Sequence, residues 1–233
     1  MTMLSRATSA SKAQKLKALF FGPAGSGKTT LLGTADKLLV LDTEGGTMSI
    51  RDTDADVLRI NTWQELEDTV RELMLSTTHG YETVGLDSVT LLQEVAGAEA
   101  GLLRAILANE DPRRAYGSIG AMVRHKILQL NALPLHVVFT AQLRERDGTD
   151  LEAGQYPLTP DVTPAILKTL MAAPDVIGRT AITQVGAETT DVEHRVIFGP
   201  ESRSQVKHRD LGLPKIAKGL TIPKLIAMIE KGA

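Results

Sequence analysis

Short apolar runs alternate with amphipathic segments along most of this 233-residue chain. Continuous apolar runs are typical of strands buried on both faces of a parallel sheet, and they occur at residues 15–21, 37–42, 57–60, 83–87 and 135–140. Helical spacing occurs between these runs, at residues 28–35, 63–75, 89–107 and 119–130, and Gly97 and Gly101 interrupt the third of these helices. Thr62 and Glu65 match a capping box at the start of the second helix. This alternation predicts an α/β fold, a mainly parallel sheet flanked by crossover helices.

The later part of the chain departs from this alternation. Apolar runs at residues 176–183 and 193–198 predict two paired strands that extend one edge of the sheet in antiparallel fashion. Helical spacing at residues 165–171 and 221–231 predicts one helix before this pair and one after it. Residues 144–163 are rich in Gly, Pro, Asp and Thr and show little periodicity, which predicts a long loop that is either functional or mobile.

Composition is that of an ordinary globular protein, and it excludes several kinds of site. Hydrophobic residues make up 42% of the chain and charged residues 23%, so a core of normal size is available. The chain has no cysteine, which excludes disulfides, thiolate zinc sites and cysteine nucleophiles. A net charge of −2 restricts any binding of nucleic acid to local basic patches. An aromatic content of 3% argues against a base-stacking platform.

The first residues differ from the rest of the chain. Residues 1–14 are basic and rich in small side chains, and they predict a flexible arm in front of a single domain at residues 15–233. This arm contains no apolar core of a signal peptide, and no apolar run approaches the roughly 18 residues that a membrane span needs. We therefore expect a cytoplasmic protein without a membrane partner.

The most specific motif follows the first predicted strand. Residues 22–29 fit the phosphate-binding pattern G-x-x-x-x-G-K-[ST], and they lie between a strand and a helix. In such a loop, backbone N–H groups surround the phosphates of ATP, the lysine reaches the β and γ phosphates, and the hydroxyl binds Mg²⁺. The alternative is an ordinary glycine turn, which the strand–loop–helix context disfavours. We expect ATP to contact Gly22, Pro23, Ala24, Gly25, Ser26, Gly27, Lys28, Thr29 and Thr30, with Thr29 also at the metal.

Polar residues stand at the ends of three later strands, where ligands bind in sheets of this kind. Asp87 is the candidate to hold Mg²⁺, and Gln142 is the candidate to sense the γ phosphate. Glu44 is the candidate to position or activate water, and Asp42, two residues earlier, competes with it for that role. Any one of these could be an ordinary polar residue leaving a strand. Their joint presence downstream of a phosphate-binding loop favours a catalytic site.

The order of these motifs resembles that of the RecA-like ATPases, most closely the small phage RecA-core proteins that act as Sak-type single-strand annealing proteins. The resemblance spans residues 16–210 and rests on the P-loop together with Asp42-Thr43-Glu44-Gly45-Gly46, Asp87-Ser88, Thr140-Ala141-Gln142 and Lys207-His208-Arg209. It implies a RecA-like P-loop core in which Glu44 is the catalytic glutamate and Gln142 couples the γ phosphate to a DNA-binding loop. It also implies that Lys207 and Arg209 reach the ATP of a neighbouring subunit; a surface ladder of charges is the alternative.

The same resemblance places DNA against two polar loops, at residues 109–116 and 144–163. Arginines there would contact phosphates without reading the base sequence. Solvated surface loops are the alternative, and acidic residues in the second loop weaken its electrostatic attraction for DNA. The candidate DNA-binding residues are Arg113, Arg114, Arg144 and Arg146.

These features together predict an ATPase that uses ATP and Mg²⁺, oligomerises on single-stranded DNA and promotes annealing or homologous recombination. The resemblance implies a filament or ring of identical subunits with ATP between them, a phage gene acting in the bacterial cytoplasm, and a single-strand binding protein as a further partner. Two other functions stay open. One is a hexameric helicase or packaging motor, which shares the P-loop and a trans-acting arginine. The other is a nucleotide-switched regulatory ATPase without a DNA function.

Overall fold

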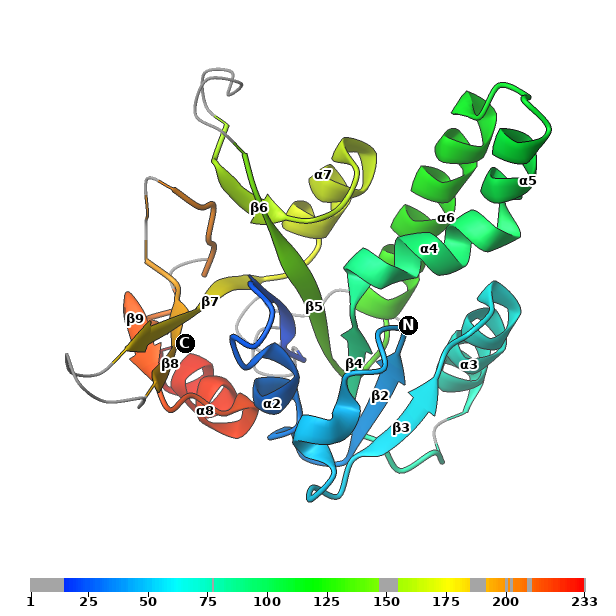
Figure 1. Cartoon of the computed structure of the whole chain (residues 1–233). Coiled ribbons are helices and arrows are strands. Elements are labelled where there is room, and N and C mark those ends of the chain that lie inside the picture. Colours follow the sequence, from blue (N-terminus) through cyan, green and yellow to red (C-terminus); the bar gives the residue numbers. More distant parts are fainter. Residues whose placement is uncertain are drawn as a thin grey trace, which may run out of the picture.

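The computed structural model describes residues 15–76, 78–146, 155–184, 192–199, 201, 203–208 and 211–232. A single sheet runs through the described part of the molecule, and helices cover both of its faces (Figure 1). The arm predicted at residues 1–14, Arg209 and the centre of the loop predicted at residues 144–163 lie outside the described residues.

The sheet is mainly parallel, which confirms the predicted fold class. Its strands lie in the order β3-β2-β4-β5-β1-β7-β8-β9, and every pair from β3 to β7 is parallel. Because β1 is flanked by β5 and β7, the loop that follows β1 opens in the middle of the carboxyl edge of the sheet. The parallel strands are β1 (Lys17–Gly22), β2 (Leu38–Asp42), β3 (Asp56–Arg59), β4 (Thr83–Asp87), β5 (His136–Glu145) and β7 (Val176–Gln184).

The antiparallel extension lies beyond β7, at the edge where the sequence predicts it. β7 pairs antiparallel with β8 (Val192–Ile197), and β8 pairs in the same sense with β9 (Ile216–Lys218). The β7–β8 pair is therefore confirmed, whereas β9 is an unpredicted strand. β9 has only three residues, and its burial pattern gives a single buried side chain, which is too short a signal for a prediction from periodicity.

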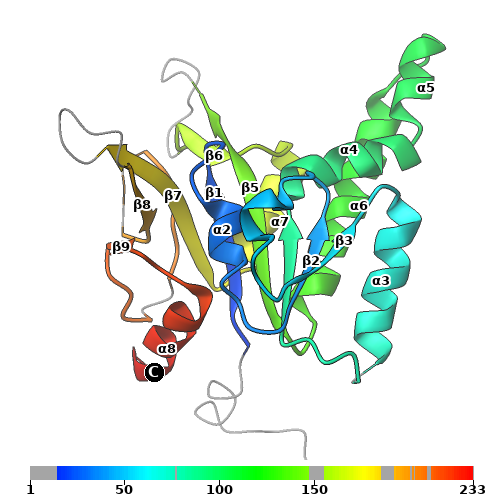
Figure 2. The same cartoon turned by 60° about the horizontal axis from the view of Figure 1, so that its bottom comes forward.

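Two hydrophobic cores fix the helices on the sheet. One core joins the sheet to α3, α4, α6 and α7, and the other joins its opposite face to α2, η1 and α8. Figure 2 shows α8 beside α2, where the Ile222 N–H donates to Thr34 Oγ1 at 2.8 Å. The helices are α2 (Lys28–Leu32), the 3₁₀ helix η1 (Thr47–Ile50), α3 (Trp63–Leu75), α4 (Val89–Glu99), α5 (Leu102–Leu107), α6 (Arg113–Asn131), α7 (Pro164–Ala172) and α8 (Ile222–Gly232).

Arg113 and Arg114 lie on a helix and not in the predicted polar loop, which is a correction. α6 begins at Arg113, directly after Pro112, so both arginines belong to its first turn. Proline suits this place because its fixed φ matches the helix and the start of a helix leaves N–H groups without an intrahelical partner. The helix predicted at residues 89–107 is divided into α4 and α5 at Gly101, which has a φ of 69°. The predicted interruption at Gly101 is therefore confirmed, whereas the one at Gly97 is wrong, because α4 continues through Gly97.

The loop predicted at residues 144–163 is wrong in part, because both of its ends form a hairpin. β5 continues to Glu145, and Arg144 pairs with Thr159 of β6 (Leu158–Pro160). The hairpin extends beyond the sheet at the upper end of Figure 1. Leu143 of β5 packs against the larger core, and Leu158 and Pro160 of β6 are buried, so a few apolar side chains anchor the hairpin. So few apolar residues in a polar segment do not give a hydrophobic period from which the two strands could be predicted.

Candidate active site

The phosphate-binding loop has a well-defined conformation between β1 and α2. Gly25 and Gly27 have φ values of 73° and 86°, in the left-handed region that favours glycine. Ser26 Oγ donates to the Pro23 carbonyl at 2.7 Å and shares a 2.7 Å hydrogen bond with Thr180 Oγ1 of β7. The loop is therefore tied both to itself and to the neighbouring strand.

Lys28 is buried with its ammonium group directed back into this loop. Its Nζ donates to the carbonyls of Gly22 at 3.0 Å and Pro23 at 2.9 Å. Burial lowers the pKa of Lys28, while the nearby carboxylates of Glu44 and Asp87 act in the opposite direction. The ammonium thus lies inside the loop and within electrostatic reach of two of the predicted catalytic carboxylates.

Asp87 is the buried carboxylate at the centre of the site. Thr29 Oγ1 donates to Asp87 Oδ2 at 2.7 Å, and the Thr140 hydroxyl donates to Asp87 Oδ1. Burial raises the pKa of Asp87, and the hydrogen bonds from Thr140 and Thr29 oppose that rise. The two predicted metal-site residues, Thr29 and Asp87, are therefore in direct contact.

The donor set of this pair suits magnesium better than a metal held by protein alone. Among the described residues, there is no group of three or more His, Cys, Asp or Glu that could hold a metal ion. Mg²⁺ is commonly held by one or two carboxylates with water and substrate phosphates completing its coordination. One hydroxyl and one carboxylate beside a phosphate-binding loop fit that pattern.

Asp42 and Glu44 occupy different positions, although they are two residues apart. Asp42 is buried, and its Oδ1 accepts the N–H groups of Glu44 at 2.9 Å and Gly45 at 2.7 Å. Its Oδ2 lies 3.2 Å from Arg59 Nη1. Asp42 therefore shapes the turn after β2, whereas Glu44 is the exposed carboxylate that this turn presents.

Gln142 lies next to Glu44 at the end of the central part of β5. Its Nε2 donates to Glu44 Oε1 at 2.8 Å, and its backbone N–H donates to Thr90 Oγ1 of α4 at 2.9 Å. The Asp161 N–H donates a hydrogen bond to the Gln142 carbonyl at 2.8 Å. Gln142 thus contacts a candidate catalytic carboxylate with its side chain and the base of the β5–β6 hairpin with its backbone.

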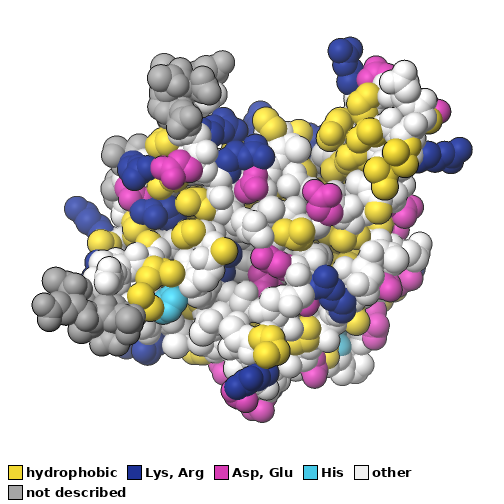
Figure 3. All heavy atoms as spheres, viewed as in Figure 1, with side chains coloured by type: hydrophobic (Ala, Val, Ile, Leu, Met, Phe, Trp, Pro, Cys, Tyr) yellow, Lys and Arg dark blue, Asp and Glu magenta, His cyan; other side chains and the backbone are white. Residues whose placement is uncertain are grey.

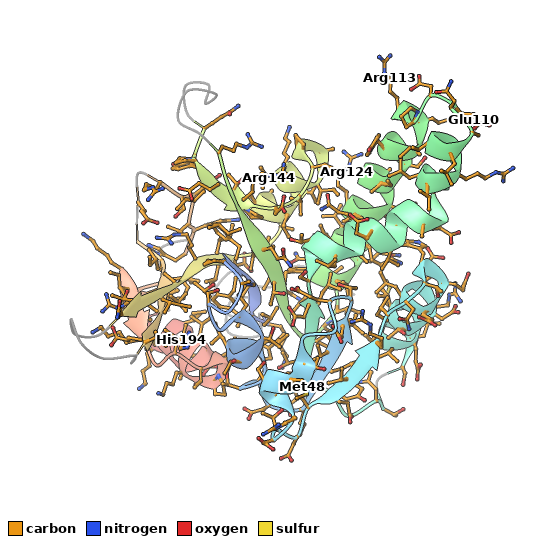
Figure 4. The ribbon with its side chains drawn as sticks, viewed as in Figure 1. Met48, Glu110, Arg113, Arg124, Arg144 and His194 are labelled. Atoms are coloured by element: carbon orange, nitrogen blue, oxygen red, sulfur yellow. The ribbon has the colours of Figure 1, made fainter. Side chains whose placement is uncertain are left out.

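The other predicted site residues lie away from this cluster. Lys207 Nζ donates to the carbonyls of Ala172 at 3.0 Å and Pro174 at 2.6 Å, at the end of α7. Arg144 pairs with Asp161 at 2.7 Å on the hairpin. Figure 4 shows Arg113 at the far end of α6, well separated from Arg144.

Three contacting side chains received no role from the sequence. Thr140 donates to Asp87, Thr180 hydrogen-bonds to Ser26, and His194 of β8 has its Nδ1 3.2 Å from the Ser26 carbonyl. Thr140 stands in a recognised strand-end motif and could have been proposed as a partner of Asp87. Thr180 of β7 and His194 of β8 gave no local signal, because these strands reach the loop only through tertiary pairing.

Within the described ranges, no helix combines the length and the apolar character that crossing a membrane requires.

Comparison with known proteins gives a family for this fold and site. A family model described as an AAA domain matches residues 14–209, which is most of the chain. No curated protein matches the sequence. Among solved structures, a RadB recombinase matches with 16% identity and a TM-score of 0.46, over 86% of this chain and 84% of that one. The family match agrees with the coarser part of the resemblance, a P-loop ATPase. The chain belongs to the AAA domain family.

Proposed function

We propose that this protein is a DNA-dependent ATPase that oligomerises on single-stranded DNA and promotes annealing or homologous recombination, like the Sak-type phage proteins it resembles. The observation that supports this most strongly is the convergence of two pairs beside the P-loop. Thr29 contacts Asp87 at 2.7 Å, and Gln142 contacts Glu44 at 2.8 Å. These pairs bring a metal-site hydroxyl, two carboxylates and an amide to one edge of the sheet.

Each of these residues has a separate role in the proposed hydrolysis of ATP. The N–H groups of Gly22–Thr29 and the Lys28 ammonium bind the phosphates, and Lys28 exchanges its two carbonyl partners for phosphate oxygens when ATP binds. Glu44 orients and deprotonates the attacking water, since it is the exposed carboxylate near Lys28. Gln142 leaves Glu44 to contact the γ phosphate. Thr29 and Asp87 would hold Mg²⁺, which would neutralise charge on the phosphates.

The proposed DNA contact is the hairpin that follows Gln142. Arg144 is only two residues further along β5, and Arg146 directly follows the last residue of that strand, where its N–H donates to the Pro157 carbonyl. Figure 3 shows Lys and Arg side chains gathered near this end of the molecule, with acidic side chains among them. Since Arg144 pairs with Asp161, contact with a DNA phosphate requires Arg144 to exchange one anionic partner for another. Arg113 and Arg114 form a second, separate candidate contact.

The proposed subunit interface includes Lys207 and Arg209. Lys207 binds two carbonyl groups at the end of α7, so its action on a neighbouring ATP requires those hydrogen bonds to be exchanged for a phosphate. ATP between subunits would then make assembly and hydrolysis depend on one another. A single-strand binding protein as partner and a phage origin rest on the resemblance alone.

The test is ATP turnover with and without single-stranded DNA, together with strand annealing and electron microscopy with an ATP analogue. We expect turnover to rise with DNA, annealing to require ATP binding, and Lys28→Ala to abolish both. ATP turnover that ignores single-stranded DNA, together with no DNA binding in the presence of ATP, would refute the DNA function. Directional unwinding of duplexes would favour a helicase or packaging motor, and very slow hydrolysis with an ATP-dependent protein partner would favour a regulatory ATPase.

A further inference from the structure

A patch of apolar side chains is exposed on the helical hairpin that α5 forms with the start of α6. Every residue of α5 is described, and none of them is buried. Leu103, Ile106 and Leu107 of α5 and Tyr116 of α6 are between 51% and 79% exposed. Figure 3 shows hydrophobic side chains gathered over this part of the molecule, with charged side chains at the edges. Contiguous exposed apolar patches mark interaction sites, whereas single exposed apolar residues are ordinary.

The spacing of the apolar residues in α5 gives this patch the form of a helical stripe. Leu103, Ile106 and Leu107 are three and four positions apart, so they lie along one side of the helix. Leu102 anchors α5, because it packs against the larger core and lies beside Gly97 of α4. The three residues of the stripe stay exposed, since no described element covers them. A second helical hairpin packed on such a stripe would complete a four-helix bundle.

The charges that flank the stripe are complementary to those of a second copy of the same hairpin. Arg104 lies in the first turn of α5, Glu110 lies three residues beyond its end, and both side chains are exposed. Figure 4 places Glu110 with Arg113 at the tip of the hairpin. In a two-fold contact with antiparallel helices, Glu110 of each copy comes beside Arg104 of the other. A parallel contact would set Arg104 beside Arg104, and these like charges would repel.

The position of the hairpin leaves room for this antiparallel contact. Figures 1 and 2 both show α5 and the first turns of α6 at the end of the molecule, beyond the sheet. Two copies can therefore overlap their hairpins side by side while their sheets lie at opposite ends of the pair.

We propose that α5 and the start of α6 form a docking surface for a second copy of this chain, with the two α5 helices antiparallel across a two-fold axis. The apolar stripes of the two copies bury one another, and a pair of Arg104 with Glu110 lies at each end of the contact. The patch is small for a permanent interface, so the dimer is weak, with a Kd on the order of 10–100 µM. This inference goes beyond the proposed function and does not depend on it, because the contact needs neither ATP nor DNA.

The test is sedimentation equilibrium of the full chain without nucleotide or DNA, over protein concentrations that bracket this Kd. We expect a monomer–dimer equilibrium that stops at the dimer, because a two-fold contact closes on itself. Leu107→Glu should raise the Kd at least about tenfold, since it places a charge in the buried stripe. Its thermal unfolding should match that of wild type, because Leu107 is 79% exposed in the single chain. Leu128→Glu, at an exposed leucine nearer the other end of α6, is the matched control and should keep the Kd within about twofold of wild type.

A pair of charge reversals tests the antiparallel arrangement. Arg104→Glu and Glu110→Arg each set like charges against one another at both ends of the contact, so each variant alone should dimerise about tenfold more weakly. An equal mixture of the two variants should form a heterodimer with an affinity close to that of wild type, because each end again joins opposite charges. Recovery in the mixture cannot come from a contact within one chain.

Several outcomes would overturn the docking surface. They are a wild-type protein that stays monomeric throughout the range, growth beyond the dimer, and a Leu107→Glu protein that dimerises as wild type does. Weakened single variants whose mixture does not recover would overturn the antiparallel two-fold contact. Absence of ATP turnover or of DNA annealing would count against the proposed function alone, because sedimentation is measured without either ligand.

Discussion

The side-chain amide of Gln142 donates a 2.8 Å hydrogen bond to Glu44, a residue 98 positions earlier in the chain. Glu44 follows β2 and Gln142 lies on β5, and β4 separates these two strands in the sheet. The contact therefore spans β4, whose last residue is Asp87, at the carboxyl edge of the sheet. The candidate catalytic carboxylate and the candidate phosphate sensor are thus hydrogen-bonded to each other.

Replacing Gln142 should separate the response to DNA from hydrolysis itself. In Gln142→Ala the phosphate-binding loop, Lys28 and Glu44 remain, so turnover without DNA should stay within about threefold of wild type. Stimulation by single-stranded DNA should fall to about onefold, because the link between the nucleotide and the hairpin is cut. Steady-state ATP turnover with and without DNA measures both. Gln64→Ala, at an exposed position of α3, should keep full stimulation. Equal losses in both conditions would show that Gln142 has no coupling role.

Replacing Glu44 should affect turnover, whereas replacing Asp42 should affect the stability of the fold. Glu44→Gln should lower kcat on the order of 10²- to 10⁴-fold, the usual contribution of a general base, and leave ATP affinity and unfolding unchanged. Asp42→Ala should instead lower the free energy of unfolding by about 1–3 kcal/mol, because two backbone N–H groups and Arg59 lose their acceptor. Turnover assays and urea unfolding on both variants provide the comparison. A stable Asp42→Ala protein with turnover as low as Glu44→Gln would reverse the two assignments.

The sequence predicts those parts of the fold that depend on local signals. α3 and β4 have the predicted bounds, since a capping box formed by Thr62 and Glu65 starts α3 and a buried apolar run forms β4. The approach of Glu44, Asp87 and Gln142 to the loop also follows from local signals, because parallel strands deliver their carboxyl ends to one edge.

The contacts that no local pattern specifies depend on tertiary pairing. Thr180 contacts Ser26 although the two residues are 154 positions apart in the sequence, and His194 contacts Ser26 across 168 positions. Lys207 stands in a motif that predicts a phosphate partner, yet its Nζ donates to the carbonyls of Ala172, the last residue of α7, and Pro174. The Lys207 backbone pairs with Ile177 of β7, which brings this segment beside the end of α7. Pairing between strands, not spacing along the chain, decides these positions.

Gln93 of α4 should hold the base of the hairpin in place. Its Nε2 donates to the Asp161 carbonyl at 3.3 Å, and its Oε1 accepts the Thr163 N–H at 2.8 Å. Gln93→Ala removes both hydrogen bonds, so local opening of the hairpin should become easier than global unfolding. We expect tryptic cleavage after Arg144 and Arg146 to accelerate about three- to tenfold, with a loss of about 1–2 kcal/mol in global stability.

The neighbouring exposed residue provides the control for that experiment. Glu94→Ala should leave the cleavage rate at the hairpin unchanged. Faster cleavage at every tryptic site in Gln93→Ala would indicate general destabilisation, and unchanged cleavage at Arg144 and Arg146 would mean that Gln93 does not restrain the hairpin.

The last prediction concerns a buried lysine at the opposite edge of the sheet. Lys17 begins β1, is 8% exposed, and donates from Nζ to the carbonyls of Leu133 at 2.7 Å and Leu135 at 2.8 Å. Burial lowers the pKa of Lys17 from 10.5 to about 8, Asp175 opposes this shift, and Lys15 adds to it. A neutral amine still has two N–H donors for the two carbonyls.

The pH dependence that follows has the opposite sign to that of an ordinary paired lysine. Between about pH 8 and 10.5 the unfolded chain keeps a proton on Lys17 that the folded protein has released, so the free energy of unfolding rises with pH through this window. Below about pH 8 both states are protonated and the contribution is constant. The rise amounts to at most about 3 kcal/mol.

Urea unfolding of wild type and Lys17→Met across the window isolates the contribution of Lys17, because other titrating groups are common to both proteins. For Lys168→Met, at an exposed lysine of α7, the free energy of unfolding should change with pH as it does in wild type. If Lys17→Met also runs parallel to wild type, Lys17 keeps an ordinary pKa in the folded protein.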